Sequence, residues 1–85
     1  MEKVKIYRCP GLRSLKRTSK IRNVDDAARV FAHRLGRKMF GRSGICLEIN
    51  RVSHGGDIII YNARIGKRNL RGPWVRIPVT FKFVR

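Results

Sequence analysis

The residues of this 85-residue chain that can do chemistry are overwhelmingly cationic. Lys and Arg total 21, Asp and Glu total 5, and the formal net charge is +16. Arg outnumbers Lys by 14 to 7, and its planar guanidinium binds phosphate oxygens in pairs and stacks on bases. So high a charge repels itself in a compact fold, and an anionic partner relieves that repulsion. Because a few charges suffice for solubility, the composition favours a nucleic-acid partner.

The cations fall into three groups along the chain. The first lies in residues 10–22, which hold five cations and no acid and predict a long loop, with a short irregular strand inside it left open. The second lies in residues 64–76, where a glycine-bounded loop over residues 66–73 carries three cations and is followed by Trp74, whose ring can stack on a base. The third is a stripe on a predicted helix. The predicted nucleic-acid contacts are Arg13, Lys16, Arg17, Lys20, Arg29, Arg37, Lys67, Arg68, Arg71 and Trp74.

These cations are not accompanied by a motif that reads bases. The sequence has no helix-turn-helix pair, no zinc finger and no basic region with a zipper, and no strand carries the aromatic pattern of RNA-recognition sheets. We therefore expect binding to the phosphate backbone of double-stranded DNA or structured RNA, largely independent of sequence. For each group the alternative is an ordinary solvated loop or helix surface.

The remaining reactive residues do not predict a metal site, a cofactor site or a catalytic centre. Cys9 and Cys46 lie 37 positions apart without a CxxC pair, and the chain has two histidines. Glu48 and Asp57 do not form a recognisable acidic pair for a metal. Because the cysteine pattern is not a disulfide framework and no apolar run indicates a signal peptide or a membrane span, we expect a cytoplasmic protein without a membrane partner.

One short segment supports a different function. Ser53-His54-Gly55 precedes an apolar stretch and follows a predicted helix, and this arrangement resembles the small interferase toxins, ribonucleases built on a sheet like that of double-stranded-RNA-binding domains. The resemblance implies that His54 acts as acid or base on an RNA 2′-hydroxyl. A turn histidine is more often simply exposed, so a metal-independent ribonuclease is an alternative and not the expectation.

The size and charge of the chain leave a third class of function open. Short basic single-domain chains include phage- or plasmid-type inhibitors and adaptors that act on host nucleic-acid machinery, such as a CRISPR complex. A component of a host or ribosomal nucleoprotein complex would show the same charge. In those cases the cations would serve a nucleic-acid channel or a nucleoprotein surface, and a protein partner would be the target.

A helix between Asn23 and Gly41 has to position the third cationic group. Asn23 can cap its first turn and Gly41 can end it. Arg29, His33 and Arg37 fall on the face opposite the apolar stripe, whereas Gly36 inside the helix costs about 1 kcal/mol relative to Ala. The predicted apolar stripe consists of Val24, Ala27, Ala28, Phe31, Leu35 and Met39.

Four strands complete the predicted fold, over residues 3–9, 45–50, 58–65 and 75–83. Residues 58–61 are apolar on both faces, which predicts a central strand. Pro78 cannot donate to a ladder and therefore predicts an edge strand or a bulge. The order β-α-β-β-β predicts an α+β fold, a single two-layer domain over residues 1–85 with one helix packed on a mainly antiparallel sheet. We expect the first strand at an edge or beside the last strand.

Overall fold

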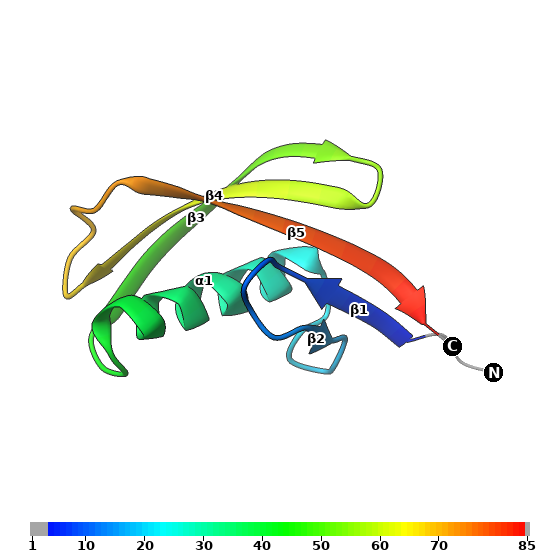
Figure 1. The fold of residues 1–85 in the computed structure, drawn as a ribbon, viewed down its shortest axis with the longest axis horizontal. Coiled ribbons are helices and arrows are strands. Elements are labelled where there is room, and N and C mark those ends of the chain that lie inside the picture. The colour runs from blue at the N-terminus through cyan, green and yellow to red at the C-terminus, as the bar shows by residue number, and fades with distance from the viewer. Residues whose placement is uncertain (1–3, 85) are drawn as a thin grey trace.

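One helix lies across a five-stranded antiparallel sheet in the computed structural model, which describes residues 4–84 (Figure 1). The predicted α+β two-layer fold is confirmed. The predicted β-α-β-β-β order omits one element, the two-residue strand β2. It lies in the basic loop over residues 10–22, where the sequence left a short irregular strand open, and it pairs with β1. In chain order the elements are β1 (Val4–Arg8), β2 (Leu15–Lys16), α1 (Val24–Phe40), β3 (Ile45–Gly55), β4 (Ile58–Lys67) and β5 (Trp74–Val84).

The strand order is β2-β1-β5-β4-β3, so the first strand lies beside the last, and β4 is internal as predicted. Pro78 lies on β5, which is not an edge strand as a whole. However, the ladder with β1 covers β5 only from Thr80 to Val84, whereas Pro78 pairs with Ile60 of β4. Pro78 therefore lies beyond the end of the β1 ladder, where one side of β5 is a local edge and the missing N–H is tolerated.

The predicted boundaries of α1 are confirmed by its caps. The Asn23 side chain accepts a hydrogen bond from the Asp26 N–H at 2.9 Å, and the Asp26 carboxylate accepts one from the Arg22 N–H at 3.0 Å. At the other end Gly41 has φ 91° and donates its N–H to the Arg37 carbonyl at 2.9 Å. Both ends of the helix thus satisfy backbone groups that would otherwise lack partners.

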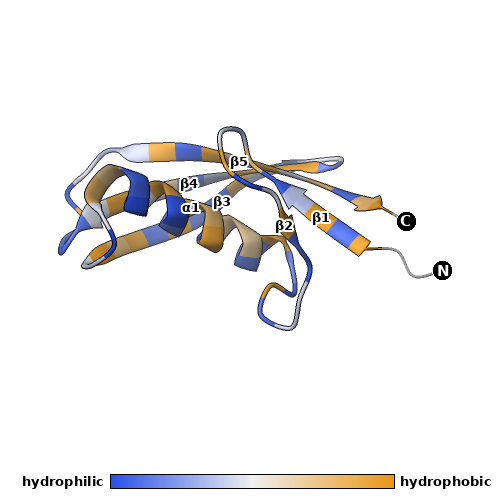
Figure 2. Ribbon diagram, turned by 60° about the horizontal axis from the view of Figure 1, so that its bottom comes forward, coloured by the Kyte–Doolittle hydropathy of each residue, from blue (hydrophilic) through white to orange (hydrophobic). Residues whose placement is uncertain are grey.

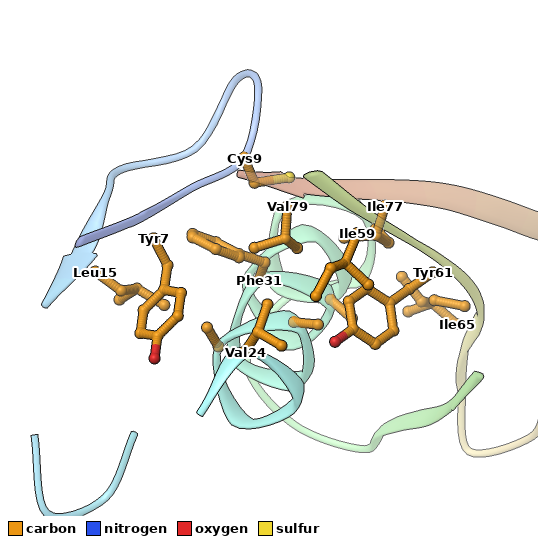
Figure 3. Packing of buried hydrophobic residues seen from close by; sticks show 14 residues of the cluster. Tyr7, Cys9, Leu15, Val24, Phe31, Ile59, Tyr61, Ile65, Ile77 and Val79 are labelled. Carbon is orange, nitrogen blue, oxygen red and sulfur yellow. The ribbon is translucent and has the colours of Figure 1, made fainter. Parts of the chain in front are cut away.

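The core lies between α1 and the sheet. Phe31 projects from α1 into a cluster that includes Tyr7 of β1 and Val79 of β5 (Figure 3). Gly36 is buried against the sheet. A Cβ at this position would lie 2.8 Å from Cγ2 of Ile65 and would clash with it. The prediction that Met39 joins the apolar stripe is wrong. Its side chain is 53 % exposed, since it lies in the last turn, past the close helix–sheet contact at Gly36.

The two faces of the sheet differ, because α1 covers one of them and no element of residues 4–84 covers the other (Figures 1 and 2). Ile77 and Val79 of β5 are buried on the helix side, and the residues that alternate with them point to the other side. We call that other side the open face. Across residues 4–84, no helix has the length and apolar character needed to cross a bilayer.

Candidate nucleic-acid interface

The two acids at the N-terminal end of α1 accept hydrogen bonds from other groups of the protein. Asp25 accepts hydrogen bonds from the Tyr61 hydroxyl and from Arg51, whose Nη2 lies 2.6 Å from the carboxylate. The Tyr61 hydrogen bond and then the Arg51 contact hold the pKa of Asp25 below its usual range. Burial, followed by the Asp25 contact, raises the pKa of Tyr61. Together with Asp26 in the helix cap, this leaves no free acid in the first turn of α1.

The rest of α1 is cationic on its exposed side. No acid occurs between Asp26 and Glu48 in the sequence. Arg34, Arg37 and Lys38 occupy the last turns, and the loop that follows carries Arg42. The Arg51–Asp25 pair is the one ion pair formed within residues 4–84, so no acid of the described chain neutralises these cations.

The loop over residues 66–73 lies at the same end of the molecule as the C-terminus of α1 (Figure 1). Arg68 has φ 64° and donates its N–H to the Gly44 carbonyl at 2.7 Å, which ties this loop to the loop that follows α1. Gly66 is required here, because a Cβ would lie 2.1 Å from the Asn69 carbonyl oxygen. The loop is therefore folded back on itself and presents its cations in a defined arrangement.

The basic loop before β2 also reaches α1. Lys38 donates its Nζ to the Gly11 carbonyl at 3.1 Å, and Arg34 donates Nη1 to the Arg13 carbonyl at 3.3 Å. These contacts bring Arg13 to the C-terminal half of the helix. Both cationic loops are therefore tied to the C-terminal half of α1 or to the loop that follows it, and we call the cations of these three segments the basic end. Its members are Arg13, Arg34, Arg37, Lys38, Arg42, Lys67, Arg68 and Arg71.

Five of the predicted contacts belong to the basic end, and three of its members were not among the predicted sites. Arg34, Lys38 and Arg42 lie between the predicted stripe and the loops, and the acid-free run from residue 27 to residue 47 was the signal that could have found them. Once α1 is placed beside two cationic loops, its side facing them matters as much as the side opposite the core.

Other predicted contacts lie away from the basic end. Lys16 of β2 pairs with Ile6 of β1, and β2 is the edge strand of the sheet farthest from β3. Arg17 and Lys20 lie in the turn that leads into the N-terminus of α1, where the Thr18 hydroxyl accepts the Lys20 N–H at 3.2 Å. These three cations are exposed and form a separate cationic region.

The predicted helix stripe opens onto a groove between α1 and β3. Arg29, His33 and Arg37 line a hollow of about 460 Å³ together with three apolar side chains. Val30 of α1 and Ile45 and Leu47 of β3 form its apolar lining. The groove therefore combines a cationic rim with an apolar floor, and it runs along an edge strand.

The two histidines and the remaining reactive groups lie apart. His54 is exposed near the tip of the β3–β4 hairpin, where its Nε2 lies 3.1 Å from the Gly56 carbonyl oxygen. Cys9 is buried, which raises the pKa of its thiol. Within residues 4–84 no three His, Cys, Asp or Glu side chains lie close enough to hold a metal ion.

Trp74, the last predicted contact, lies on the open face at the start of β5. Its direct cross-strand partner is Arg64 of β4, whose guanidinium carbon lies 4.6 Å from the ring centroid.

Comparison of the chain with protein-family models, with curated proteins and with solved structures gives no match. The candidate interface is therefore argued from the geometry and charge of the chain itself.

Proposed function

We propose that the protein binds nucleic acid through the phosphate backbone, with the basic end as its contact surface. One observation carries the proposal. Cations from three separate segments are held near the C-terminal half of α1 by the backbone hydrogen bond from Arg68 to Gly44 and by side-chain hydrogen bonds from Arg34 and Lys38 to loop carbonyls. No acid within residues 4–84 pairs with these cations. Double-stranded DNA and structured RNA both present a dense row of phosphates, and such a surface binds them largely independently of sequence.

The attraction has to come from side chains and not from the helix backbone. The C-terminal end of a helix carries a partial negative charge, which repels phosphate, and the basic end lies at that end of α1. The ordered 66–73 loop and the loop at Arg13 offset this by holding their cations close together before binding, which lowers the entropic cost of ordering them. Binding of this kind releases counterions and is therefore strongly salt-dependent.

The experiment compares two triple variants that lower the net charge equally. Lys67→Ala, Arg68→Ala and Arg71→Ala change the basic end, whereas Lys16→Ala, Arg17→Ala and Lys20→Ala change the other cationic region. For the unchanged protein on duplex DNA, contacts with about 5–7 phosphates predict a slope of log K against log[salt] of about −4 to −6. The basic-end triple should reduce the magnitude of that slope by about 2–3, and it should weaken binding to unrelated sequences alike.

Fluorescence anisotropy of labelled duplexes over a salt series measures both quantities. A slope shallower than about −2, or no binding at low salt, would refute phosphate-dominated binding. Equal losses from the two triples would show that net charge alone matters and that the basic end is not the contact surface.

A second candidate function, an adaptor or inhibitor directed at a protein, is favoured by the edge of β3. β3 is the long edge strand of the sheet, with eleven residues, whereas the other edge strand β2 has two. An unpaired edge of this length is a template for an added strand. The adjoining groove has Arg29 and Arg37 on its rim and Leu47 on its floor, and this chemistry fits an extended acidic segment with alternating apolar residues.

A short peptide of alternating Asp and Val tests this second function. It should protect β3 backbone amides from hydrogen exchange, and Arg29→Ala should weaken its binding more than Arg34→Ala, which removes the same charge outside the groove. The same peptide with alternate backbone nitrogens methylated cannot form the ladder and should fail to bind. Equal binding of both peptides would count against strand addition.

A further inference from the structure

A hollow beside Trp74 on the open face is not used by the basic end. It has a volume of about 170 Å³ and is lined by Asn50, Val52, Asn62 and Trp74, and we call it the Trp74 pocket. Trp74 is the one tryptophan of the chain and is 41 % exposed. Arg64 stacks on the indole but does not line the hollow. The ring therefore has a cation against it outside the pocket and offers its remaining surface to the pocket.

Two amides form the polar part of this pocket. Asn50 of β3 and Asn62 of β4 are direct cross-strand partners, and within residues 4–84 neither side chain donates or accepts a hydrogen bond. An amide offers a donor and an acceptor side by side, the pattern with which Asn reads the edge of a base. Two unused amides next to an exposed tryptophan are therefore suited to a flat ring with polar edges.

A β-bulge positions Val52, the remaining residue that lines the Trp74 pocket. The register between β3 and β4 shifts between Arg51 and Ser53, so Val52 has no partner of its own in the ladder. Its side chain is 55 % exposed and lines the hollow. Bulges redirect side chains and are common beside functional sites. Here the bulge adds an apolar surface to a pocket that otherwise has amides and one aromatic ring.

The charges around the pocket connect it to the basic end. Trp74 directly follows the 66–73 loop, and Arg64 donates Nη1 to the Leu70 carbonyl of that loop at 3.4 Å. Arg76 lies directly opposite Asn62. The acid on this part of the open face, Glu48, lies opposite Arg64 and makes no ion pair within residues 4–84. A nucleic-acid strand whose phosphates contact the 66–73 loop can thus place a base on Trp74.

We propose that the Trp74 pocket binds one unpaired nucleobase, stacked on the indole and hydrogen-bonded at its edge by Asn50 and Asn62. The proposal rests on the proposed nucleic-acid binding and deepens it, because it names the form of nucleic acid. Bases of a regular duplex are stacked inside the helix, whereas a single strand, loop or bulge presents them to aromatic side chains. The preferred ligand is therefore a nucleic acid with an accessible single-stranded segment next to its phosphate contacts.

The single tryptophan provides a direct test with the intact protein. Mixed-sequence single-stranded DNA and a blunt duplex of the same sequence are titrated at low salt, with Trp74 fluorescence and the anisotropy of labelled DNA recorded in parallel. We expect both to bind, and only the single strand to quench Trp74. Trp74→Leu should weaken single-strand binding by about tenfold and leave duplex binding nearly unchanged.

A paired set of variants tests the amides. Asn50→Leu with Asn62→Leu should weaken single-strand binding and flatten differences among homopolymers, whereas Thr80→Val, on the open face outside the pocket, should do neither. Single-strand binding without quenching, or equal quenching by duplex, would overturn the pocket and leave the phosphate proposal intact. Equal loss of single-strand and duplex binding in Trp74→Leu would assign Trp74 to supporting the loop and would also overturn the pocket. Failure of both DNAs to bind would overturn both proposals.

Discussion

At its N-terminal end α1 carries Asp25 and Asp26, and at its C-terminal end it carries Arg37 and Lys38. Both pairs suit the helix dipole, yet the two ends differ in their surroundings. The acids accept hydrogen bonds from β3, β4 and the cap, whereas Arg37 and Lys38 have no carboxylate partner within residues 4–84, and Lys38 bonds to the Gly11 carbonyl. A carboxylate that accepts hydrogen bonds within the fold contributes to folding, and a cation without a carboxylate partner keeps its charge available to an external anion. The first end should therefore govern stability and the second end binding.

The largest expected effect on stability comes from Asp25→Ala. Its loss leaves the Tyr61 hydroxyl without its acceptor in a buried position, which costs about 1–3 kcal/mol of unfolding free energy. We assign this cost to Tyr61 and not to the Arg51 pair, because both members of that pair are about half exposed and such pairs contribute little. Urea unfolding measures the effect. The basic-end triple Lys67→Ala, Arg68→Ala and Arg71→Ala should change the same quantity by about 0.5 kcal/mol or less.

The acid dependence of stability gives a control for Asp25. Its pKa is lower in the folded protein than in the unfolded chain, so the folded state binds this proton less tightly. The Asp25 contribution is therefore complete above the usual carboxyl pKa of about 3.9 and is lost as the pH falls from there toward the lowered value. Asp25→Asn should remove that part of the loss of unfolding free energy at acid pH. If the acid dependence of stability were unchanged, or if the basic-end triple were as unstable as Asp25→Ala, the N-terminal end of α1 would not govern stability more than the basic end.

Local patterns predicted the elements well and their meeting points poorly. The caps Asn23 and Gly41 and the apolar run from Ile58 depend on neighbouring residues, so they could be recognised in the sequence. The contact between Arg68 and Gly44 joins residues 24 positions apart, and nothing local indicates it. Gly36 looked like a cost to the helix, and only the placement of Ile65 against it shows why no larger residue fits.

The candidate site shows the same limit. The cationic loops could be identified from composition, because a run of Arg and Lys without acids is visible in any register. Which cations share a surface depends on how the loops fold back on α1, and this is decided by contacts such as Lys38 with Gly11. Asn50 and Asn62 were missed because an asparagine in a strand carries no signal until the register places it opposite another.

A smaller effect separates two buried tyrosines and sharpens the comparison. Tyr61 donates its hydroxyl to Asp25, whereas the Tyr7 hydroxyl is buried and makes no hydrogen bond within residues 4–84. Tyr61→Phe should cost about 1 kcal/mol of unfolding free energy, because it removes one hydrogen bond and leaves the half-exposed Asp25 carboxylate with Arg51 and solvent as partners. Tyr7→Phe removes the same atom without removing a hydrogen bond, so it should be neutral or slightly stabilising. Both changes keep the ring and its packing, and urea unfolding of the two variants isolates the hydroxyl. Equal losses would mean that the Tyr7 hydroxyl also has a partner, such as an ordered water, and that the hydrogen bond to Asp25 does not set Tyr61 apart.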